Sequence, residues 1–176
     1  MKIRMIITAL LCSAALVSAQ SLFRANLDPA QDGGGGRTGT GFVDLTLTGT
    51  TLTLDGAFSG LSANANNAHI HGPSGPYPAS AGVLYNLGTG VNIIPLGGTS
   101  GTIHGSVTLA DIGAYTLSQQ LADLNNSRWY INIHSVGQFA GGEIRGAIVP
   151  VPEPSTWALM GFSAVGLIWS LRRKKA

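Results

Sequence analysis

Two neighbouring stretches in the central part of the chain alternate between apolar and polar residues. They run over residues 42–48 and 51–58, and Gly49 and Thr50 separate them. Alternation with a period of two on both sides of a short turn predicts a β-hairpin, because successive side chains of a strand point to opposite faces. Most polar positions are threonines, whose branched Cβ fits a strand better than a helix. We therefore expect an antiparallel hairpin that buries its leucines.

Short apolar runs separated by turn-forming residues continue through the rest of the centre. We expect further strands in four of these runs, at residues 83–87, 103–109, 130–134 and 143–149. One segment has helical spacing instead, since Leu117, Leu121 and Leu124 recur at intervals of four and three residues. Several short strands at this spacing predict an all-β fold, an antiparallel β-sandwich with Greek-key-like connections and one short helix.

The first 19 residues predict a signal peptide. Lys2 and Arg4 precede an apolar run, and Ala19 ends a small-residue cleavage site, so the mature chain would begin at Gln20. The apolar run is too short for a transmembrane helix, which needs about 20 residues. The single cysteine, Cys12, lies in this segment, and a lipid anchor on it is disfavoured because the preceding residue is not small. One cysteine also excludes a disulfide scaffold, a zinc ribbon and a thioredoxin-like motif.

Three parts follow one another at the other end of the chain, over residues 151–176. A stiff segment containing Pro152, Glu153 and Pro154 comes first, and an apolar run over 157–171 follows it. The last part is a basic cluster made of Arg172, Arg173, Lys174 and Lys175. The apolar run predicts a hydrophobic helix, short for a stable bilayer crossing. The positive-inside rule would keep the basic cluster in the cytoplasm and the body of the protein outside.

This order of parts resembles the PEP-CTERM sorting signal of bacteria with two-membrane envelopes. The resemblance implies recognition by an exosortase, a membrane protease of the transpeptidase type. It also implies transient insertion into the inner membrane, followed by transfer to the cell envelope, the cell surface or the extracellular space. A permanent single-pass anchor is the alternative, because proline-rich linkers beside membrane helices are common.

The net charge of the predicted domain differs in sign from that of the whole chain. The whole chain has a formal net charge of +2, but six of its ten lysines and arginines lie in the two end segments. Residues 20–150, the predicted domain, contain four arginines, seven acidic residues and no lysine, which gives a net charge of −3. A nucleic-acid partner would need a basic surface and is therefore not expected.

Histidines gather in two of the expected strands. His69 and His71 are two residues apart, so they would share one face of a strand. By the same rule His134 shares a face with Tyr130 and Asn132. The sequence therefore predicts that imidazoles from two strands can converge.

A third polar segment lies at the start of the last expected strand. Glu143 and Arg145 would share one side of that strand. We expect them to form an ion pair, or a bidentate contact with a loop, and in either case to serve the fold. A contact with a ligand or partner is the alternative.

Together the three segments resemble the CHRD domain, the repeated module of chordin that also occurs in exported bacterial proteins. The matching sequences are His-Ile-His-Gly-Pro at 69–73, Tyr-x-Asn-x-His-Ser at 130–135 and Gly-Gly-Glu-Ile-Arg-Gly at 141–146. The resemblance covers roughly residues 22–149 and departs from the family at Ser135, where threonine is usual. It implies a small β-sandwich, usually extracellular, with no firmly established catalytic activity.

The three histidines suggest a metal site. His69, His71 and His134 could bind copper or zinc and leave a fourth position open. The candidates that would support such a site are His104 as a fourth ligand and Asn132 or Glu143 as acceptors that orient an imidazole. The alternative is a structural hydrogen-bond network built from the same histidines and Asn132.

Enzymatic classes fit the sequence poorly. A His-x-His strand on a sandwich also looks like copper–zinc superoxide dismutase, whose dinuclear site uses six histidines and an aspartate, but this chain has four histidines. A mononuclear copper site survives this comparison. The Gly-x-Ser-x-Gly motif of hydrolases is absent from the sequence, and carboxylates are few.

We therefore expect a non-enzymatic exported protein that acts in adhesion, in the extracellular matrix or by binding a partner. The expected processing partners are signal peptidase and an exosortase, and the expected external partner is a polysaccharide or a protein. The alternatives are a redox-type sandwich that binds copper or zinc and a permanently membrane-anchored surface module.

Overall fold

The computed structural model describes residues 20–75 and 79–152 of the chain. Several predicted features lie outside these residues: the signal peptide up to Ala19, Glu153 and Pro154 of the sorting motif, and the C-terminal hydrophobic helix with its basic cluster. The predicted domain boundaries, 1–19, 20–150 and 151–176, stay predictions. No helix in the described residues has the length and apolar character needed to cross a membrane.

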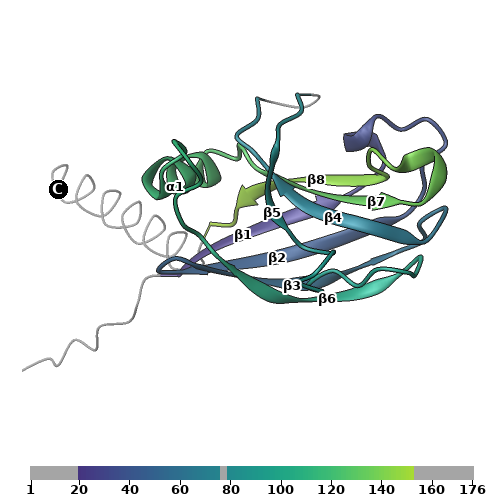
Figure 1. The fold of residues 1–176 in the computed structure, drawn as a ribbon, viewed down its shortest axis with the longest axis horizontal. Coiled ribbons are helices and arrows are strands. Elements are labelled where there is room, and N and C mark those ends of the chain that lie inside the picture. Colours follow the sequence, from purple (N-terminus) through teal and green to yellow (C-terminus); the bar gives the residue numbers. More distant parts are fainter. Residues whose placement is uncertain (1–19, 76–78, 153–176) are drawn as a thin grey trace, which may run out of the picture.

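The described residues form eight strands, one α-helix and two short 3-10 helices (Figure 1). The strands are β1 (Gln20–Leu27), β2 (Thr40–Thr48), β3 (Thr51–Ser59), β4 (Ala65–His71), β5 (Val83–Asn86), β6 (Gly101–Thr108), β7 (Tyr130–Ser135) and β8 (Ile144–Pro150). The helices are η1 (Ala30–Asp32), α1 (Leu117–Asn125) and η2 (Gly137–Phe139).

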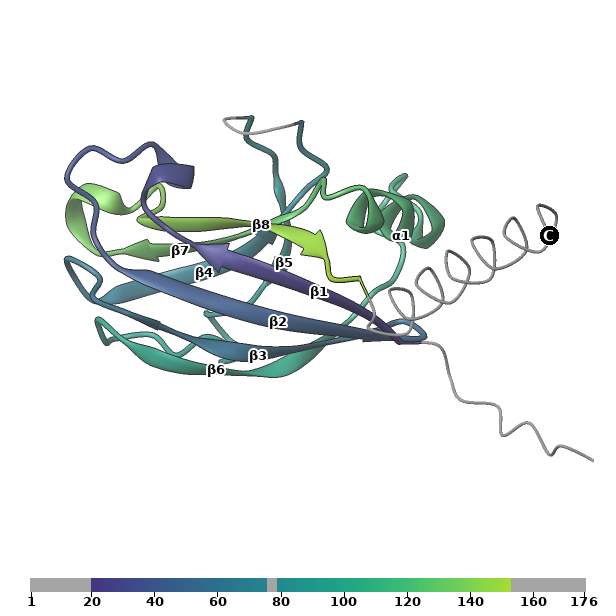
Figure 2. The same cartoon turned by 180° about the vertical axis from the view of Figure 1, so that it is seen from behind.

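All eight strands belong to one antiparallel sheet, in the order β5-β4-β7-β8-β1-β2-β3-β6. The sheet curls so that its two halves face each other, as the two opposite views show (Figures 1 and 2). We call β4, β5, β7 and β8 the histidine half and β1, β2, β3 and β6 the threonine half. The halves are joined where β1 pairs with β8, with Arg24 opposite Val149. The predicted antiparallel sandwich with one short helix is confirmed, and its two layers are parts of a single sheet.

The predicted hairpin is the β2–β3 pair. Thr48 lies opposite Thr51, and Gly49 takes the left-handed conformation (φ 61°) that the turn between them requires. The apolar side of both strands faces the interior, where Val43 and Leu52 have no exposed surface. Side-chain alternation therefore determined the buried face of these strands, as expected.

The sequence pattern did not identify β1. Phe23, Ala25 and Leu27 alternate in this strand as buried residues, each at most 1% exposed. This run starts directly after the predicted signal peptide. The expected last strand was placed one residue early, because β8 begins at Ile144 and Glu143 precedes it.

The expected helix forms as α1, between β6 and β7. Thr116 caps its N-terminus, since the Thr116 hydroxyl accepts from the Gln119 backbone N–H and the Gln119 side chain accepts from the Thr116 N–H. Leu124 and Gln120 anchor the helix against the sheet without any exposed surface. The buried Gln120 amide is satisfied, because it donates to the Ala110 carbonyl oxygen at 2.6 Å and accepts from the Tyr85 hydroxyl.

Candidate metal centre

Neighbouring strands β4 and β7 carry the three histidines. In their antiparallel register His69 lies opposite Asn132, and Asn67 lies opposite His134. The apolar residues between them, such as Ile70 and Ile133, are fully buried on the inner face of the sheet. The alternation therefore directs His69, His71 and His134 to the outer face of the histidine half.

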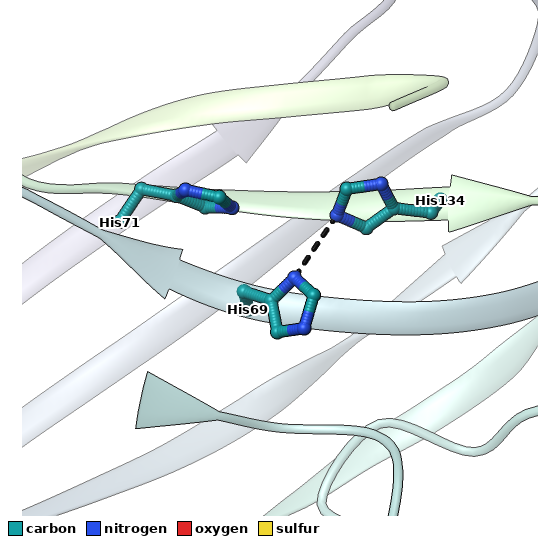
Figure 3. A group of neighbouring side chains, drawn as sticks. All are labelled: His69, His71 and His134. Carbon is teal, nitrogen blue, oxygen red and sulfur yellow. Dashed lines mark hydrogen bonds between the residues drawn. The ribbon is translucent and has the colours of Figure 1, made fainter. Parts of the chain in front are cut away.

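The structure brings the three rings together (Figure 3). One nitrogen from each of His69, His71 and His134 lies within 4.8 Å of the others. The closest pair is His69 Nδ1 and His134 Nε2, at 3.1 Å. His71 and His134 are each only 9% exposed, whereas His69 is partly open to solvent. Metal binding at this cluster stays a prediction. The three nitrogens lie close enough to one another for a single ion to contact all of them.

Backbone carbonyls fix the orientation of two of these rings. His71 Nδ1 lies 3.0 Å from the Ala81 carbonyl oxygen, and His134 Nδ1 lies 2.9 Å from that of Ala140. Because a carbonyl oxygen only accepts, Nδ1 carries the proton in both rings and Nε2 carries the lone pair. Nε2 of His71 is buried and has no hydrogen-bond partner among the described residues. Metal-binding histidines commonly have this arrangement, with one nitrogen tied to a carbonyl and the other free to bind.

The environment favours neutral imidazoles. Burial, together with the nearby His134 and His71, lowers the pKa of His69 to about 4. Burial also lowers the pKa of His71, and although the Ala81 carbonyl acts in the opposite direction, His134 and Arg145 add to the lowering. Since a metal ion binds the deprotonated ring, both histidines are ready to act as ligands near neutral pH.

Tyr130 and Arg145 support the cluster from the side. The Tyr130 ring stacks on the His71 ring, with centroids 4.8 Å apart and planes 1° from parallel. The Arg145 guanidinium carbon lies 3.4 Å from the Tyr130 ring centroid, and its Nη2 donates to the Ala79 carbonyl oxygen at 2.6 Å. β7 lies between β4 and β8 in the sheet, so Tyr130 connects an arginine on one neighbouring strand to a histidine on the other.

Glu143 connects the outer face to two distant loops. Its Oε1 accepts from the Ser62 N–H at 2.6 Å and from the Thr38 N–H at 3.3 Å, and the residue has no exposed surface. Burial raises the pKa of Glu143, but the hydrogen bonds from Ser135, Ser62 and Thr38 outweigh it, so the pKa lies below its ordinary value. These contacts give Glu143 a structural role in holding the loops.

Asp32 and Arg37 were missed by the sequence analysis. Arg37 Nε lies 3.4 Å from Asp32 Oδ2 and donates to the Gly142 carbonyl oxygen at 3.0 Å. Burial raises the pKa of Asp32, and the charges of Arg37, Arg145 and His134 partly offset this. No periodic pattern marks this loop, and its glycine run was the only local signal.

The approach between this loop and β7 is close. A Cβ atom on Gly142, whose φ is +137°, would lie 2.3 Å from Asp32 Oδ2 and 2.5 Å from the side-chain amide nitrogen of Asn132. Asn132 is 4% exposed, so the predicted acceptor lies within this polar layer. Only glycine leaves room for the three groups.

His104, the suggested fourth ligand, lies elsewhere. Its side chain is 79% exposed on β6, in the threonine half, and its Nδ1 contacts Asp55 at 2.5 Å. The neighbouring Ile103 is 1% exposed and occupies the inner face, so alternation turns His104 outward. The suggestion that His104 completes the site is therefore wrong, and within the described part of the chain the cluster offers three candidate ligands.

A pocket of about 410 Å³ opens beside the stacked pair. Its lining includes Gln31, Ser74, Arg128, Tyr130 and Arg145. Tyr130 and Arg145 thus border both this pocket and the histidine cluster. The pocket combines hydrogen-bonding groups with an aromatic ring, which is the usual make-up of a small-ligand site.

Comparisons with known proteins agree with this arrangement. The profile of the CHRD domain matches residues 23–148, which span β1 to β8 and include all three clustered histidines. The profile of the PEP-CTERM protein-sorting motif matches residues 150–174 and begins at the last residue of β8. No curated protein matches the chain.

Proposed function

Because this chain belongs to the CHRD domain family and carries a PEP-CTERM sorting motif, we propose that it acts outside the cytoplasm as a non-enzymatic binding module. The motif marks a protein that is exported, processed by an exosortase and sorted to the cell envelope. The finer role, in adhesion, matrix building or binding of a polysaccharide or protein, is our proposal.

The pocket beside Tyr130 carries this proposal. It is large enough for a sugar ring or a peptide side chain, and the residues that line it include Arg128, Arg145 and Ser74. Ordinary binding sites combine one aromatic surface with a few such polar groups. The domain therefore has a place to hold a partner once sorting has delivered it.

A fractionation experiment tests the sorting and the binding together. Cells that produce the wild-type chain and a Pro152→Ala, Glu153→Ala, Pro154→Ala variant would be separated into inner membrane, outer envelope and extracellular matrix. We expect the processed wild-type protein in the outer fractions and the uncut variant in the inner membrane, as judged by mass spectrometry.

Chemical cross-linking in the outer fractions should capture a polysaccharide or protein partner on the wild type and less of it on an Arg128→Gln variant. A processed protein that stays free and monomeric in those fractions would contradict the binding role.

Metal binding is the second candidate function. The observation that favours it is the buried, unpartnered Nε2 of His71, which faces the same cluster as nitrogens of His69 and His134. Three imidazoles would hold one copper or zinc ion and leave a position open for a further ligand. The ion would supply Lewis acidity or a redox centre, while the chain orients its ligands through Ala81 and Ala140.

Elemental analysis of protein purified from the envelope tests this candidate. We expect about one equivalent of copper or zinc per chain, since the cluster offers a single set of ligands. Chelation should lower the melting temperature of the wild type and of a His104→Ala control, but not that of a His71→Ala variant. A metal-free protein whose melting temperature ignores both added metal and chelator would exclude the site.

A further inference from the structure

We propose that the histidine cluster is built for Cu(I) in preference to Cu(II) or Zn(II), and that Arg145, acting through Tyr130, contributes to this preference. The inference rests on the proposed metal binding and names the ion. Four features of the described residues support it: the number of ligands, their neutrality, their burial and a fixed positive charge nearby.

The ligand set has three neutral nitrogens. Among the described residues, no fourth histidine, cysteine, aspartate or glutamate joins His69, His71 and His134 within ligand distance. Structural zinc sites almost always have four protein ligands, and zinc on three histidines needs water as the fourth ligand. Cu(II) prefers four or more ligands in a tetragonal arrangement. Cu(I), a closed-shell ion of single charge, is satisfied by three imidazoles. The set therefore completes the coordination of Cu(I) and leaves the divalent ions short of ligands.

Burial limits the supply of the missing ligands. Water could complete a divalent site, but His71 and His134 are each 9% exposed, and the loops that carry Ala81 and Ala140 hold their rings from behind. His69 is the only partly open member of the three. Because a divalent ion loses more hydration free energy on burial than a monovalent one, the enclosure favours the monovalent ion.

Arg145 places a permanent positive charge near the cluster. Its guanidinium carbon lies 3.4 Å from the Tyr130 ring centroid, and the Tyr130 and His71 centroids lie 4.8 Å apart, so the charge is at most about 8 Å from the centre of the His71 ring. This charge repels a divalent ion twice as strongly as a monovalent one.

The two acidic residues near the cluster, Asp32 and Glu143, lie outside its ligand set. Arg37 Nε lies 3.4 Å from Asp32 Oδ2, so the positive charge of the arginine offsets the negative charge of that carboxylate. Glu143 accepts backbone hydrogen bonds from Ser62 and Thr38, on the side of the two loops that it holds. Since neither carboxyl belongs to the ligand set, no anionic ligand offsets the second charge of a divalent ion.

Competition titrations of the full-length exported chain test the inference. Cu(I) would be titrated without oxygen against bathocuproine disulfonate, Zn(II) against a chromophoric chelator, and Cu(II) binding would be followed by electron paramagnetic resonance. We expect one Cu(I) per chain, bound at least tenfold more tightly than Zn(II). His69→Ala, His71→Ala and His134→Ala should each weaken Cu(I) binding by more than about 100-fold, the upper end of the loss seen for outer-shell partners. His104→Ala is the matched control and should bind as the wild type does.

Substitutions of Arg145 test its contribution to the Cu(I) preference separately. Arg145→Gln should narrow the preference for Cu(I) over Zn(II) by about tenfold, because one nearby charge is removed. Arg145→Lys, which keeps the charge, should retain the preference, and Arg24→Gln, at an exposed arginine of the threonine half, is the matched arginine control. Thermal melting would verify that each variant is folded. The ratio of the Cu(I) and Zn(II) affinities of the wild-type protein tests the Cu(I) preference even if a variant fails to fold.

The possible outcomes distinguish the preference for Cu(I) from metal binding at the cluster itself. Zn(II) bound at the three histidines as tightly as Cu(I) would overturn the Cu(I) assignment and leave metal binding intact. Absence of binding for every ion would overturn both. An unchanged preference in Arg145→Gln would overturn the contribution of Arg145.

Discussion

In the threonine half of the sheet the outer face is open to solvent, whereas in the histidine half loops cover it. On β3 and β6 the outward residues Asp55 and His104 have side chains 60% and 79% exposed and pair with each other. On β7 every residue is buried, including the outward-facing Asn132 and His134. The strands of both halves follow the same alternation, so the difference comes from the segments that lie over them.

This difference teaches what turns a polar strand face into a site. His71 and His104 each follow a buried isoleucine in a strand, and both point away from the interior. His104 meets a surface aspartate, but His71 meets the Ala81 carbonyl and the Tyr130 ring, and its second nitrogen is left without a partner. The covering loop thus sets the chemistry of the residue, because it removes water and selects the tautomer.

The segments that cover the histidine half pack very closely at Gly142, so a substitution there should have the largest effect. Gly142→Ala should lower the free energy of unfolding by about 4 kcal/mol, because the new Cβ would overlap Asp32 and Asn132 in a buried layer. Gly49→Ala is the matched control in the threonine half. Gly49 also has a positive φ, but nothing lies within 4 Å of its added Cβ, so a loss of about 1 kcal/mol is expected. Urea unfolding measures both, and equal losses would show that crowding in the covering layer is unimportant.

The next largest expected difference in unfolding free energy between the two halves comes from the buried carboxylate of Glu143. Glu143→Ala should cost about 3 kcal/mol of unfolding free energy, because the backbone N–H groups of Ser62 and Thr38 lose their acceptor in a buried place. Asp55→Ala removes an exposed carboxylate from the other half and should cost at most about 0.5 kcal/mol. Chemical denaturation of the two variants under the same conditions compares them directly. A similar cost at both positions would mean that Glu143 does not hold the loops.

Acid should weaken the histidine half through His69. The pKa of His69 is lowered to about 4, chiefly by burial, so between pH 6.5 and about 4 the unfolded chain binds a proton that the folded chain does not. Stability therefore falls as the pH drops through this window, by about 2 kcal/mol after allowance for the partial exposure of the ring. His69→Gln should flatten this part of the curve of unfolding free energy against pH, while His104→Ala should keep it. An identical slope in His69→Gln and the wild type would contradict the assignment.

The two halves also differ in how far sequence reasoning could reach. Alternation predicted the β2–β3 hairpin, put His69 and His71 on one strand face and put His134 on the same face as Tyr130 and Asn132, because side-chain direction in a strand depends on parity alone. Parity does not tell which layer a strand joins. His104 was therefore suggested as a fourth ligand although it lies in the other half.

The cover of the site could not be predicted. Ala81 and Ala140 act through backbone carbonyls, which leave no trace in residue type, and Asp32 and Arg37 come from a loop without periodicity. Their positions depend on long-range packing that brings residues more than 100 apart together, as in the hydrogen bond from Arg37 to Gly142. A structural contact of Glu143 with a loop was among the expectations, but the two loops that it holds, at Thr38 and Ser62, could not be named from the sequence for the same reason.

The pairing of β1 with β8 has a consequence for the order of events during export. A chain that crosses a membrane with its N-terminus first presents β1 to β3 of the threonine half, then β4 and β5, and only then β6 and β7. The hydrogen bonds that join the two halves of the sheet run through β8. Such a long-range closure cannot precede the arrival of residues 144–150. The sheet is therefore completed only as the chain reaches the matched sorting motif, which starts at residue 150. Folding and the signal for exosortase processing thus become available at the same moment of translocation.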